Sequence, residues 1–200
     1  MIVIGITGPT GAGKTTVLNV LKELGGCVLD ADAVYHEMLD SDFTLRHLLE
    51  RRFGPLTRED GTFDRKKLGA VVFHDPAALA ELNGIAHGRV VAELSQRLTR
   101  ARESGIQIAA IDAIALFESG AAELCRTTVA VTARSEVRAR RIMAREGISE
   151  EYARARIAAQ KPPQWFEERC DHILRNDGGR EDLEDRARAL LLSIIPKEEL

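Results

Sequence analysis

The sequence is poor in aromatic residues and has no long apolar run. Phe, Trp and Tyr make up 4% of its 200 residues. No apolar stretch reaches the roughly 18 residues that a membrane-spanning helix needs. No basic segment precedes an apolar one at the N-terminus, as it would in a secretion signal. These absences predict a cytoplasmic protein with no membrane partner.

Neither sign of charge dominates the composition. The chain has 28 Lys and Arg against 31 Asp and Glu, a formal net charge of −3. A domain that binds nucleic acid usually carries a basic excess, so we expect no nucleic-acid partner. The apolar fraction of 44% is ordinary for a globular protein.

Cysteines are few and widely spaced. The three of them, Cys27, Cys125 and Cys170, form no CxxC pair and are odd in number. This pattern predicts buried free thiols in a reducing compartment rather than disulfides or a zinc site. The chain also has no repeats, no low-complexity segments and no Gly/Ser linker. We therefore expect residues 1–200 to form a single domain.

Short apolar runs recur along the chain with helical segments between them. The predicted strands are 2–6, 27–29, 107–111, 128–131 and 172–174. Each is rich in Ile, Val or Leu and too short to be a helix. Strands that alternate with helices pair in parallel and are covered on both faces. The sequence therefore predicts an α/β fold with a five-stranded parallel sheet flanked by helices.

Two helical insertions interrupt this alternation. Residues 33–104 contain no convincing strand, and 45–53 and 76–102 within them are predicted helices. A second helical insertion is expected near 134–170. The predicted core is what remains, at about 1–32, 105–133 and 171–200.

The segment GPTGAGKTT, residues 8–16, fits GxxxxGK[ST] at every fixed position. It follows a predicted strand and opens a predicted helix over 16–24, which is the context that this phosphate-binding motif requires. Glycines let successive backbone N–H groups turn toward an anion, and the helix N-terminus adds its positive end. Lys14 is expected to reach the β- and γ-phosphates and the Thr15 hydroxyl to bind Mg2+. The expected nucleotide contacts in this P-loop are Gly8, Gly11, Ala12, Gly13, Lys14, Thr15 and Thr16.

The P-loop alone does not specify a reaction. The strings NKxD and DxxG, typical of Ras-like GTPases, do not occur. Asp112 is a candidate acidic strand end for a motor ATPase, but nothing else supports a motor. A kinase needs a base for the acceptor, a positive clamp on the phosphoryl group and a closing lid. A nucleotide-dependent binding module or switch, without an acceptor, remains an alternative.

The candidate base lies in the segment LDAD, residues 29–32. Ligands bind beyond the carboxyl ends of strands in open α/β sheets. If Asp30 ends the strand and Asp32 opens the following loop, Asp32 can accept the acceptor's proton. The alternative is that either aspartate caps a helix starting near Ala33.

The candidate clamp is a stripe of arginines. Arg134, Arg138, Arg141 and Arg145 follow the i, i+4, i+7, i+11 spacing of one helix face. The planar guanidinium group binds phosphate oxygens in pairs and stays charged. The alternative is a solvated basic face, since Glu136 and Glu146 are close in sequence.

These parts, in this order, resemble the dephospho-coenzyme A kinase family over essentially the whole chain. The matching strings include TGPTGAGKT, VLDADAVYHEML, DGTFDRKKLGAVVF, LNGIAHGRVV, LFESG, RRIMAREG, AAQ and DHILRN. The P-loop is shared by many families, but the other strings are specific in combination. The resemblance implies a three-layer P-loop kinase fold with an acceptor-binding insertion at 33–104 and a lid at 134–170.

The resemblance also implies a reaction and its residues. The reaction is transfer of the ATP γ-phosphoryl group, with Mg2+, to the ribose 3'-hydroxyl of dephospho-CoA. Asp32 would be the catalytic carboxylate, and Arg141 and Arg145 would belong to the lid. Arg65 and His87 would lie in the acceptor domain. The remaining assignment is to Asn176, which with residues 177–179 would lie near the adenine of ATP.

The chain departs from the family's pattern at two positions. It has His87-Gly88 where the family usually has His-Pro, and IALFE at 114–118 where the family usually has PLLFE. Both departures concern the acceptor pocket, so a related kinase of a nucleoside or nucleotide is the alternative. We expect a monomer or a weak homo-oligomer.

Overall fold

The sheet has the five strands that the sequence predicts. A computed structural model describes residues 1–196. Its strands are β1 (Ile2–Thr7), β2 (Cys27–Asp30), β3 (Ile108–Asp112), β4 (Thr127–Thr132) and β5 (His172–Arg175). Each strand agrees with its predicted range to within one residue at either end, so the predicted strand pattern is confirmed.

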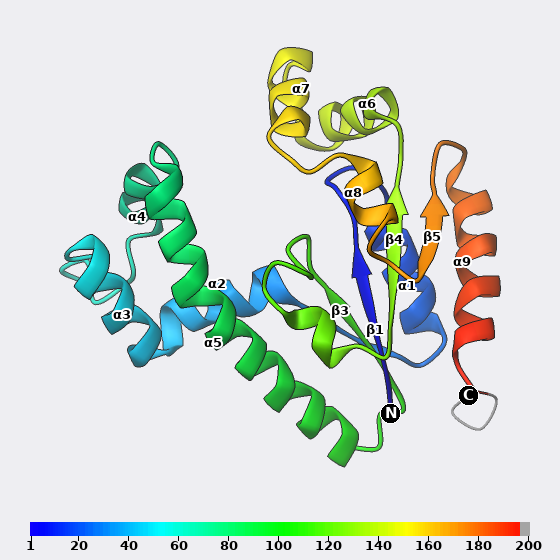
Figure 1. Cartoon of the computed structure of the whole chain (residues 1–200), viewed down its shortest axis with the longest axis horizontal. Coiled ribbons are helices and arrows are strands. Elements are labelled where there is room, and N and C mark those ends of the chain that lie inside the picture. The colour runs from blue at the N-terminus through cyan, green and yellow to red at the C-terminus, as the bar shows by residue number, and fades with distance from the viewer. Residues whose placement is uncertain (197–200) are drawn as a thin grey trace. The chain divides into compact units, whose positions relative to one another are not determined.

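The strands form one sheet in the order β2-β3-β1-β4-β5 (Figure 1). β1 pairs in parallel with β3 and with β4, and β4 pairs in parallel with β5. The register places Gly5 opposite Ile111 on one side and Thr128 on the other. The predicted five-stranded parallel sheet is therefore confirmed. Its central strand ends at the P-loop, a position where open α/β sheets bind ligands.

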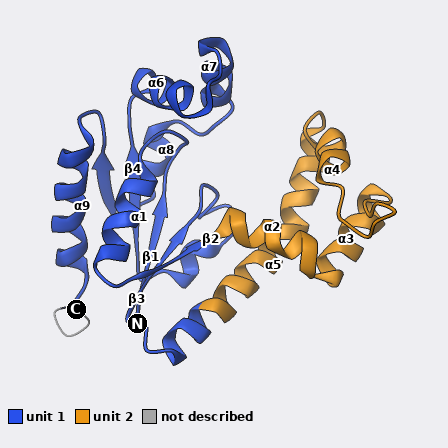
Figure 2. Ribbon diagram, turned by 180° about the vertical axis from the view of Figure 1, so that it is seen from behind, with its two compact units in different colours: residues 1–29, 98–200 blue, residues 30–97 orange. Residues whose placement is uncertain are grey.

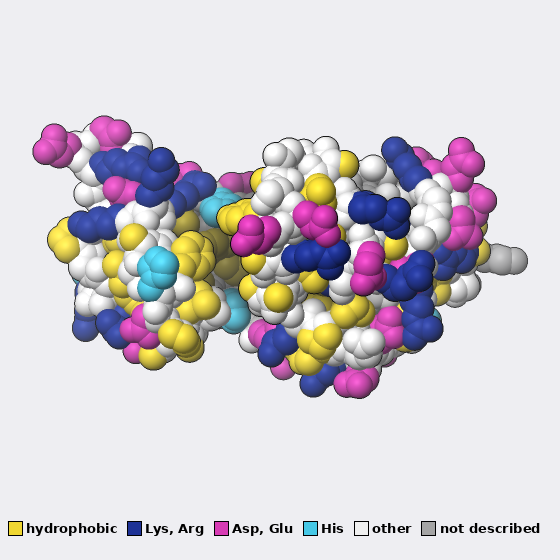
Figure 3. Space-filling model, turned by 90° about the horizontal axis from the view of Figure 1, so that it is seen from above, with side chains coloured by type: hydrophobic (Ala, Val, Ile, Leu, Met, Phe, Trp, Pro, Cys, Tyr) yellow, Lys and Arg dark blue, Asp and Glu magenta, His cyan; other side chains and the backbone are white. Residues whose placement is uncertain are grey.

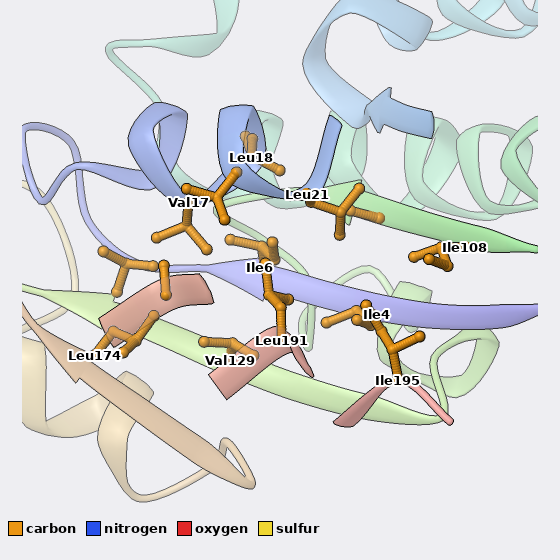
Figure 4. Close-up of a cluster of buried hydrophobic side chains, with 14 of the residues drawn as sticks. Ile4, Ile6, Val17, Leu18, Leu21, Ile108, Val129, Leu174, Leu191 and Ile195 are labelled. Atoms are coloured by element: carbon orange, nitrogen blue, oxygen red, sulfur yellow. The ribbon is translucent and has the colours of Figure 1, made fainter. Parts of the chain in front are cut away.

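Two helices cover one face of the sheet. α1 (Lys14–Glu23) and α9 (Arg180–Ile194) contact each other. Between helices and sheet lies a buried cluster that includes Ile4, Ile6, Val17, Leu21, Val129 and Leu191 (Figure 4). Ile4 and Ile6 point to the same face because side chains alternate along a strand. Each fully buried aliphatic side chain contributes about 1.5–3 kcal/mol relative to exposure.

Shorter elements contact the sheet through β1 and β4. The 3₁₀ turn η1 (Ala121–Leu124) contacts β1, and α8 (Pro163–Glu167) contacts β4. Phe166 of α8 is fully buried. The Trp165 ring stands edge-on to Phe117, with centroids 6.0 Å apart. α6 (Ser135–Glu146) and α7 (Glu150–Ala158) pack on each other.

The chain forms two compact units (Figure 2). The larger unit comprises residues 1–29 and 98–200, and the smaller one is Asp30–Arg97. The smaller unit contains α2 (Ala31–Ser41), α3 (Phe43–Phe53), α4 (Arg65–Val72) and most of α5 (Pro76–Glu103). Its buried side chains include Val34, Met38, Leu45, Leu49, Leu68, Leu82 and Leu94. Apart from Asp30, the last residue of β2, only an isolated bridge between Thr57 and Phe63 has β character among the described residues of this unit.

The compact units do not have the same boundaries as the predicted insertions. The smaller unit ends at Arg97, whereas the predicted insertion runs over 33–104. α4 is absent from the prediction, and α2 corresponds to the helix starting near Ala33 that the sequence offers only as an alternative. The predicted lid, 134–170, groups with the larger unit. Residues 197–200 of the predicted core lie outside the described residues.

The surface charges and the three thiols can be located in the structure. On the face shown in Figure 3, basic and acidic side chains are interspersed. The three cysteines are free thiols, each half-buried. Burial raises the pKa of Cys125 to about 12 and that of Cys170 to about 11. Within residues 1–196, no helix is long and apolar enough to cross a membrane.

Asp171, just before β5, forms hydrogen bonds to the start of β4. These bonds predict that the stability of the fold depends on pH. Its carboxylate accepts hydrogen bonds from the Thr128 N–H at 2.8 Å and the Thr128 hydroxyl at 2.9 Å. These bonds hold the pKa of Asp171 below its ordinary value. A lowered folded-state pKa means that the stabilisation is present above the unfolded-state pKa, near 3.9, and is lost as pH falls through the folded one.

We therefore expect Asp171→Asn to melt below the wild type at pH 7, with the difference shrinking as pH falls below about 4. Melting curves of both proteins between pH 7 and pH 2.5 measure this. A difference that does not change with pH would contradict the assignment.

Candidate active site

The P-loop, residues 8–16, connects the central strand to α1, and two of its glycines are required by close contacts. Gly8 has φ 139°, and a Cβ there would lie 2.0 Å from the Val131 carbonyl oxygen of β4. Gly13 has φ 107°, and a Cβ there would lie 2.3 Å from the Asn176 side-chain nitrogen. Gly13 is the N-cap of α1, which begins at Lys14 rather than at Thr16 as predicted.

The P-loop presents backbone donors in the way an anion site requires. The Ala12 N–H donates to the Pro9 carbonyl and the Thr16 N–H to the Gly13 carbonyl. Within residues 1–196, the N–H groups of Gly11 and Gly13 donate to no protein acceptor. Such amides, together with the positive end of α1, form an anion-binding concavity.

Lys14 and Thr15 occupy the first turn of α1. The Lys14 ammonium donates to the Gly8 carbonyl at 3.0 Å, so its side chain folds back along the P-loop. The Thr15 side chain is exposed at the helix start. Both residues therefore lie where the motif predicts, beside the loop amides.

Asn176, just after β5, is buried and binds the backbone of the P-loop. Its side-chain N–H donates to the Ala12 carbonyl at 2.8 Å, and its backbone N–H donates to the Thr132 carbonyl at 2.7 Å. Its side-chain oxygen accepts from Arg141 at 3.1 Å. This side chain therefore binds the backbone of the P-loop and the guanidinium group of Arg141. The sequence did not indicate that Asn176 supports the P-loop in this way.

Arg141 bridges the P-loop region and the segment after β5. Its guanidinium group donates to the Asn176 and Gly178 carbonyls, at 3.0 and 3.2 Å. All of its hydrogen-bond acceptors are neutral oxygens. Partial burial lowers the pKa of Arg141, and the nearby Asp177 opposes that effect. A half-buried, charged guanidinium group at this position can accept an anionic ligand.

The four arginines of the predicted stripe have different surroundings in the structure. Arg138 is buried, with its Nε 2.8 Å from the Thr10 carbonyl. Arg145 is exposed and forms an ion pair with Glu146, which also forms an ion pair with Arg156. Arg134 lies before α6, 3.4 Å from Asp177. The structure therefore brings Arg138 and Arg141 to the P-loop region, while the hydrogen bond and the ion pair of Arg145 go to Glu146.

The segment after β2 also differs from its prediction. Asp30 is the N-cap of α2: its carboxylate accepts from the Asp32 and Ala33 N–H groups, at 2.9 and 3.0 Å. Asp32 does not open a loop, because it lies in the first turn of α2. Its side chain is exposed. The capping alternative is thus correct for Asp30, and Asp32 is left as the candidate base.

The other predicted acceptor residues belong to the same unit as Asp32. Arg65 donates to the His36 carbonyl at 3.0 Å and to the Asp40 carboxylate at 2.6 Å, so it packs along α2. Burial raises the pKa of Tyr35 to about 12, against an opposing effect of the Arg65 charge. His87 is half-buried on α5 and makes no side-chain hydrogen bond to residues 1–196.

The departure at Gly88 has a structural consequence. α5 runs without interruption through His87 and Gly88. A proline at Gly88 would remove a helical hydrogen bond and kink the helix. The smaller unit of this chain therefore has a continuous helix at that point.

The fold and the loop define a class of protein, the P-loop kinases. Shikimate kinase from Bacteroides thetaiotaomicron, 16% identical over 96% of this chain and 98% of its own, superposes with a TM-score of 0.52, which supports the fold alone. The model of the dephospho-CoA kinase family matches residues 2–182. The chain belongs to the dephospho-CoA kinase family, which catalyses the last step of coenzyme A biosynthesis.

Individual relatives agree with this family. The dephospho-CoA kinase of Symbiobacterium thermophilum is 37% identical over 94% of this chain and 78% of its own length. That of Geobacter sulfurreducens is 34% identical over 98% of this chain and 100% of its own. A crystal structure of TT1252 from Thermus thermophilus, 35% identical, covers 98% of both chains with a TM-score of 0.79.

Proposed function

We propose that this protein transfers the γ-phosphoryl group of ATP to the ribose 3'-hydroxyl of dephospho-CoA, giving coenzyme A and ADP. The observation that carries the proposal is the family match over residues 2–182. A P-loop already shaped for an anion supports it, since Gly11 and Gly13 offer their N–H groups there.

The proposed roles follow from the chemistry of phosphoryl transfer. The P-loop amides and Lys14 hold the triphosphate, and Arg141 neutralises charge that spreads over the transferred group. The acceptor oxygen forms a bond to the γ-phosphorus as the bond to the β–γ bridging oxygen breaks. The hydroxyl proton passes to Asp32, the candidate base. Arg65 and His87 contribute to the acceptor site, and Arg145 to the lid.

The residues at the start of α1 fit a magnesium ion. Mg2+ prefers oxygen ligands and usually takes few from the protein, with phosphate oxygens and water completing its shell. Thr15 provides an exposed hydroxyl in the first turn of α1. When bound, the ion would neutralise phosphate charge between the β- and γ-groups.

We expect removal of divalent metal by EDTA to abolish turnover, and added Mg2+ to restore it. Thr15→Val, which keeps the shape of the side chain and removes its oxygen, should raise the Mg2+ concentration needed for half-maximal rate. Thr15→Ser should stay near wild type because it keeps the hydroxyl. The measurement is a Mg2+ titration of the initial rate, and an unchanged titration in Thr15→Val would remove Thr15 from the metal site.

The test of the function is direct. The protein is incubated with ATP, Mg2+ and dephospho-CoA, and the products are identified by mass. We expect a product one phosphate heavier than dephospho-CoA, with one ADP per product. A panel of nucleosides and nucleotides, scored for ADP release, tests the other acceptor class. ATP binding without transfer to dephospho-CoA would overturn the proposal.

A further inference from the structure

Arg138 is a buried arginine without a protein counter-charge. Only 1% of its surface is exposed. It donates from Nε to the Thr10 carbonyl at 2.8 Å and from Nη2 to the Gln160 side-chain oxygen at 2.7 Å, and both acceptors are neutral. Within residues 1–196 no carboxylate forms an ion pair with it. The loop residue that it holds, Thr10, belongs to the P-loop.

Gln160 lies in the segment between α7 and α8 and also binds Thr10. Its side-chain oxygen also accepts from the Thr10 N–H at 3.0 Å, and its side-chain nitrogen donates to the Thr10 hydroxyl at 2.7 Å. Arg138 and Gln160 together therefore bind the N–H, the carbonyl and the hydroxyl of one P-loop residue.

Holding the Thr10 carbonyl fixes the direction of the next amide. In a planar trans peptide the C=O and the following N–H point in opposite directions. With its carbonyl turned to Arg138, the Thr10–Gly11 peptide directs the Gly11 N–H away from Arg138. Asn176 has the same effect on the Gly13 N–H, because it binds the Ala12 carbonyl. Within residues 1–196 neither of these two amides donates to a protein acceptor, so both are available to an anion.

The charge of Arg138 adds a second effect. A buried charge without a counter-charge costs free energy, and an opposite charge bound nearby recovers part of that cost. Burial lowers the pKa of Arg138, but a guanidinium group stays protonated in proteins. A polyphosphate bound by the P-loop would place negative charge on the loop that Arg138 supports.

We propose that Arg138 and Gln160 are positioning residues that preset the P-loop for a nucleotide polyphosphate, and that the bound polyphosphate supplies the counter-charge of Arg138. This inference rests on the proposed function only as far as ATP binding. It is independent of the acceptor. It also assigns Gln160 a role that the sequence did not indicate, beyond its place in the string AAQ.

The decisive comparison is between Arg138→Met and Arg138→Lys. Arg138→Met removes the charge at similar volume, and we expect the Kd for ATP to rise about tenfold or more, the size of one charge interaction across a partly polar interior. Arg138→Lys keeps the charge and should stay within about threefold of wild type. Isothermal titration of ATP into each protein at about 0.15 M salt, where exposed charges are screened, measures both constants.

Arg140→Met is the matched control. Arg140 is an exposed neighbour on α6, and its loss changes the net charge by the same amount. We expect its Kd for ATP to stay within about threefold of wild type, because exposed charges are screened. The counter-charge proposal would be overturned if Arg140→Met weakened ATP binding as much as Arg138→Met does. It would also be overturned if Arg138→Lys weakened ATP binding as much as Arg138→Met does.

The melting temperature separates this role from a structural one. Removing an uncompensated buried charge need not destabilise a protein, so we expect ligand-free Arg138→Met to melt at or above the Arg138→Lys temperature. The shift that saturating ATP adds should be smaller in Arg138→Met. An ATP-induced shift equal to the wild-type shift would overturn the proposal. If Arg138→Met does not fold, Arg138→Gln takes its place, with the same expectations.

Gln160 is tested through its partner. Gln160→Ala and Thr10→Val should each raise the Kd for ATP, and the double variant should bind no more weakly than the weaker single variant, because both remove the same contact. Gln164→Ala, an exposed glutamine in α8, is the control and should bind ATP as the wild type does. Additive losses would remove Gln160 from this role.

The wild-type titration distinguishes the two proposals. If the wild-type protein binds ATP but makes no coenzyme A, the acceptor assignment is refuted, and the ATP titrations of the Arg138 and Gln160 variants still test the inference. Wild type that does not bind ATP overturns the inference itself.

Discussion

Asp32→Asn should retain ATP binding and lose turnover by about 10²- to 10⁴-fold, the usual contribution of a general base. Asparagine has nearly the same shape as aspartate but cannot accept the proton of the acceptor hydroxyl. The side chain is exposed in the first turn of α2, so the change should leave the fold intact. The measurement is kcat with ATP and dephospho-CoA, beside the Kd for ATP.

The chain offers a control two residues away. Asp30→Asn makes the same chemical change at the N-cap of α2, where asparagine is as good a cap as aspartate. We expect Asp30→Asn to keep kcat within about threefold of wild type and to keep its melting temperature. Turnover that survives in Asp32→Asn would show that Asp32 is not the base. A loss as large in Asp30→Asn would show that the charge of the segment, not a base, is what matters.

The sheet could be predicted because its strands are short apolar runs buried among helices. Ile2–Thr7 is buried along its whole length, and β3 and β4 are nearly so. Such strands have no polar alternation and stand out from helical neighbours. In the smaller unit the prediction has no helix at α4, which is only eight residues long and has two buried side chains, Leu68 and Val72. A short amphipathic segment carries too few apolar positions to separate it from a loop.

The segment after β2 shows why local sequence left two aspartates unresolved. Both Asp30 and Asp32 suit an N-cap, and a cap is recognised by which N–H groups it binds. The structure separates them, since the Asp30 carboxylate binds two N–H groups at the start of α2. Sequence spacing alone does not contain that information.

The supports of the P-loop could not be predicted for a different reason. Spacing places Arg138 and Arg141 on one helix face, and a helix of charged residues suggests a solvated surface. Burial of Arg138 depends on contacts with Thr10 and Gln160, which lie 128 and 22 residues away along the chain. Periodicity reports the face of a helix, not the segment that will cover it. The P-loop itself could be predicted because its motif is one continuous string of residues between a strand and a helix.

Gly8→Ala should destabilise the protein by about 2–5 kcal/mol, from a backbone angle that side chains rarely adopt and from overpacking. The new Cβ would lie 2.0 Å from the Val131 carbonyl, and backbone in the central strands cannot yield as a flexible side chain can. Relief requires the P-loop to move away from β4. The Lys14 ammonium, which donates to the Gly8 carbonyl, would move with it. We therefore also expect ATP binding to fall steeply.

Gly25→Ala separates the contact from the backbone angle. Gly25 has φ 84°, also in the left-handed region, but a Cβ there would meet nothing within 4 Å. It should cost only about 1–2 kcal/mol and leave ATP affinity unchanged. Denaturant unfolding and ATP titration of both variants measure the difference. If Gly8→Ala lost no more stability than Gly25→Ala, the close packing of the P-loop on β4 would not be what makes glycine necessary at residue 8.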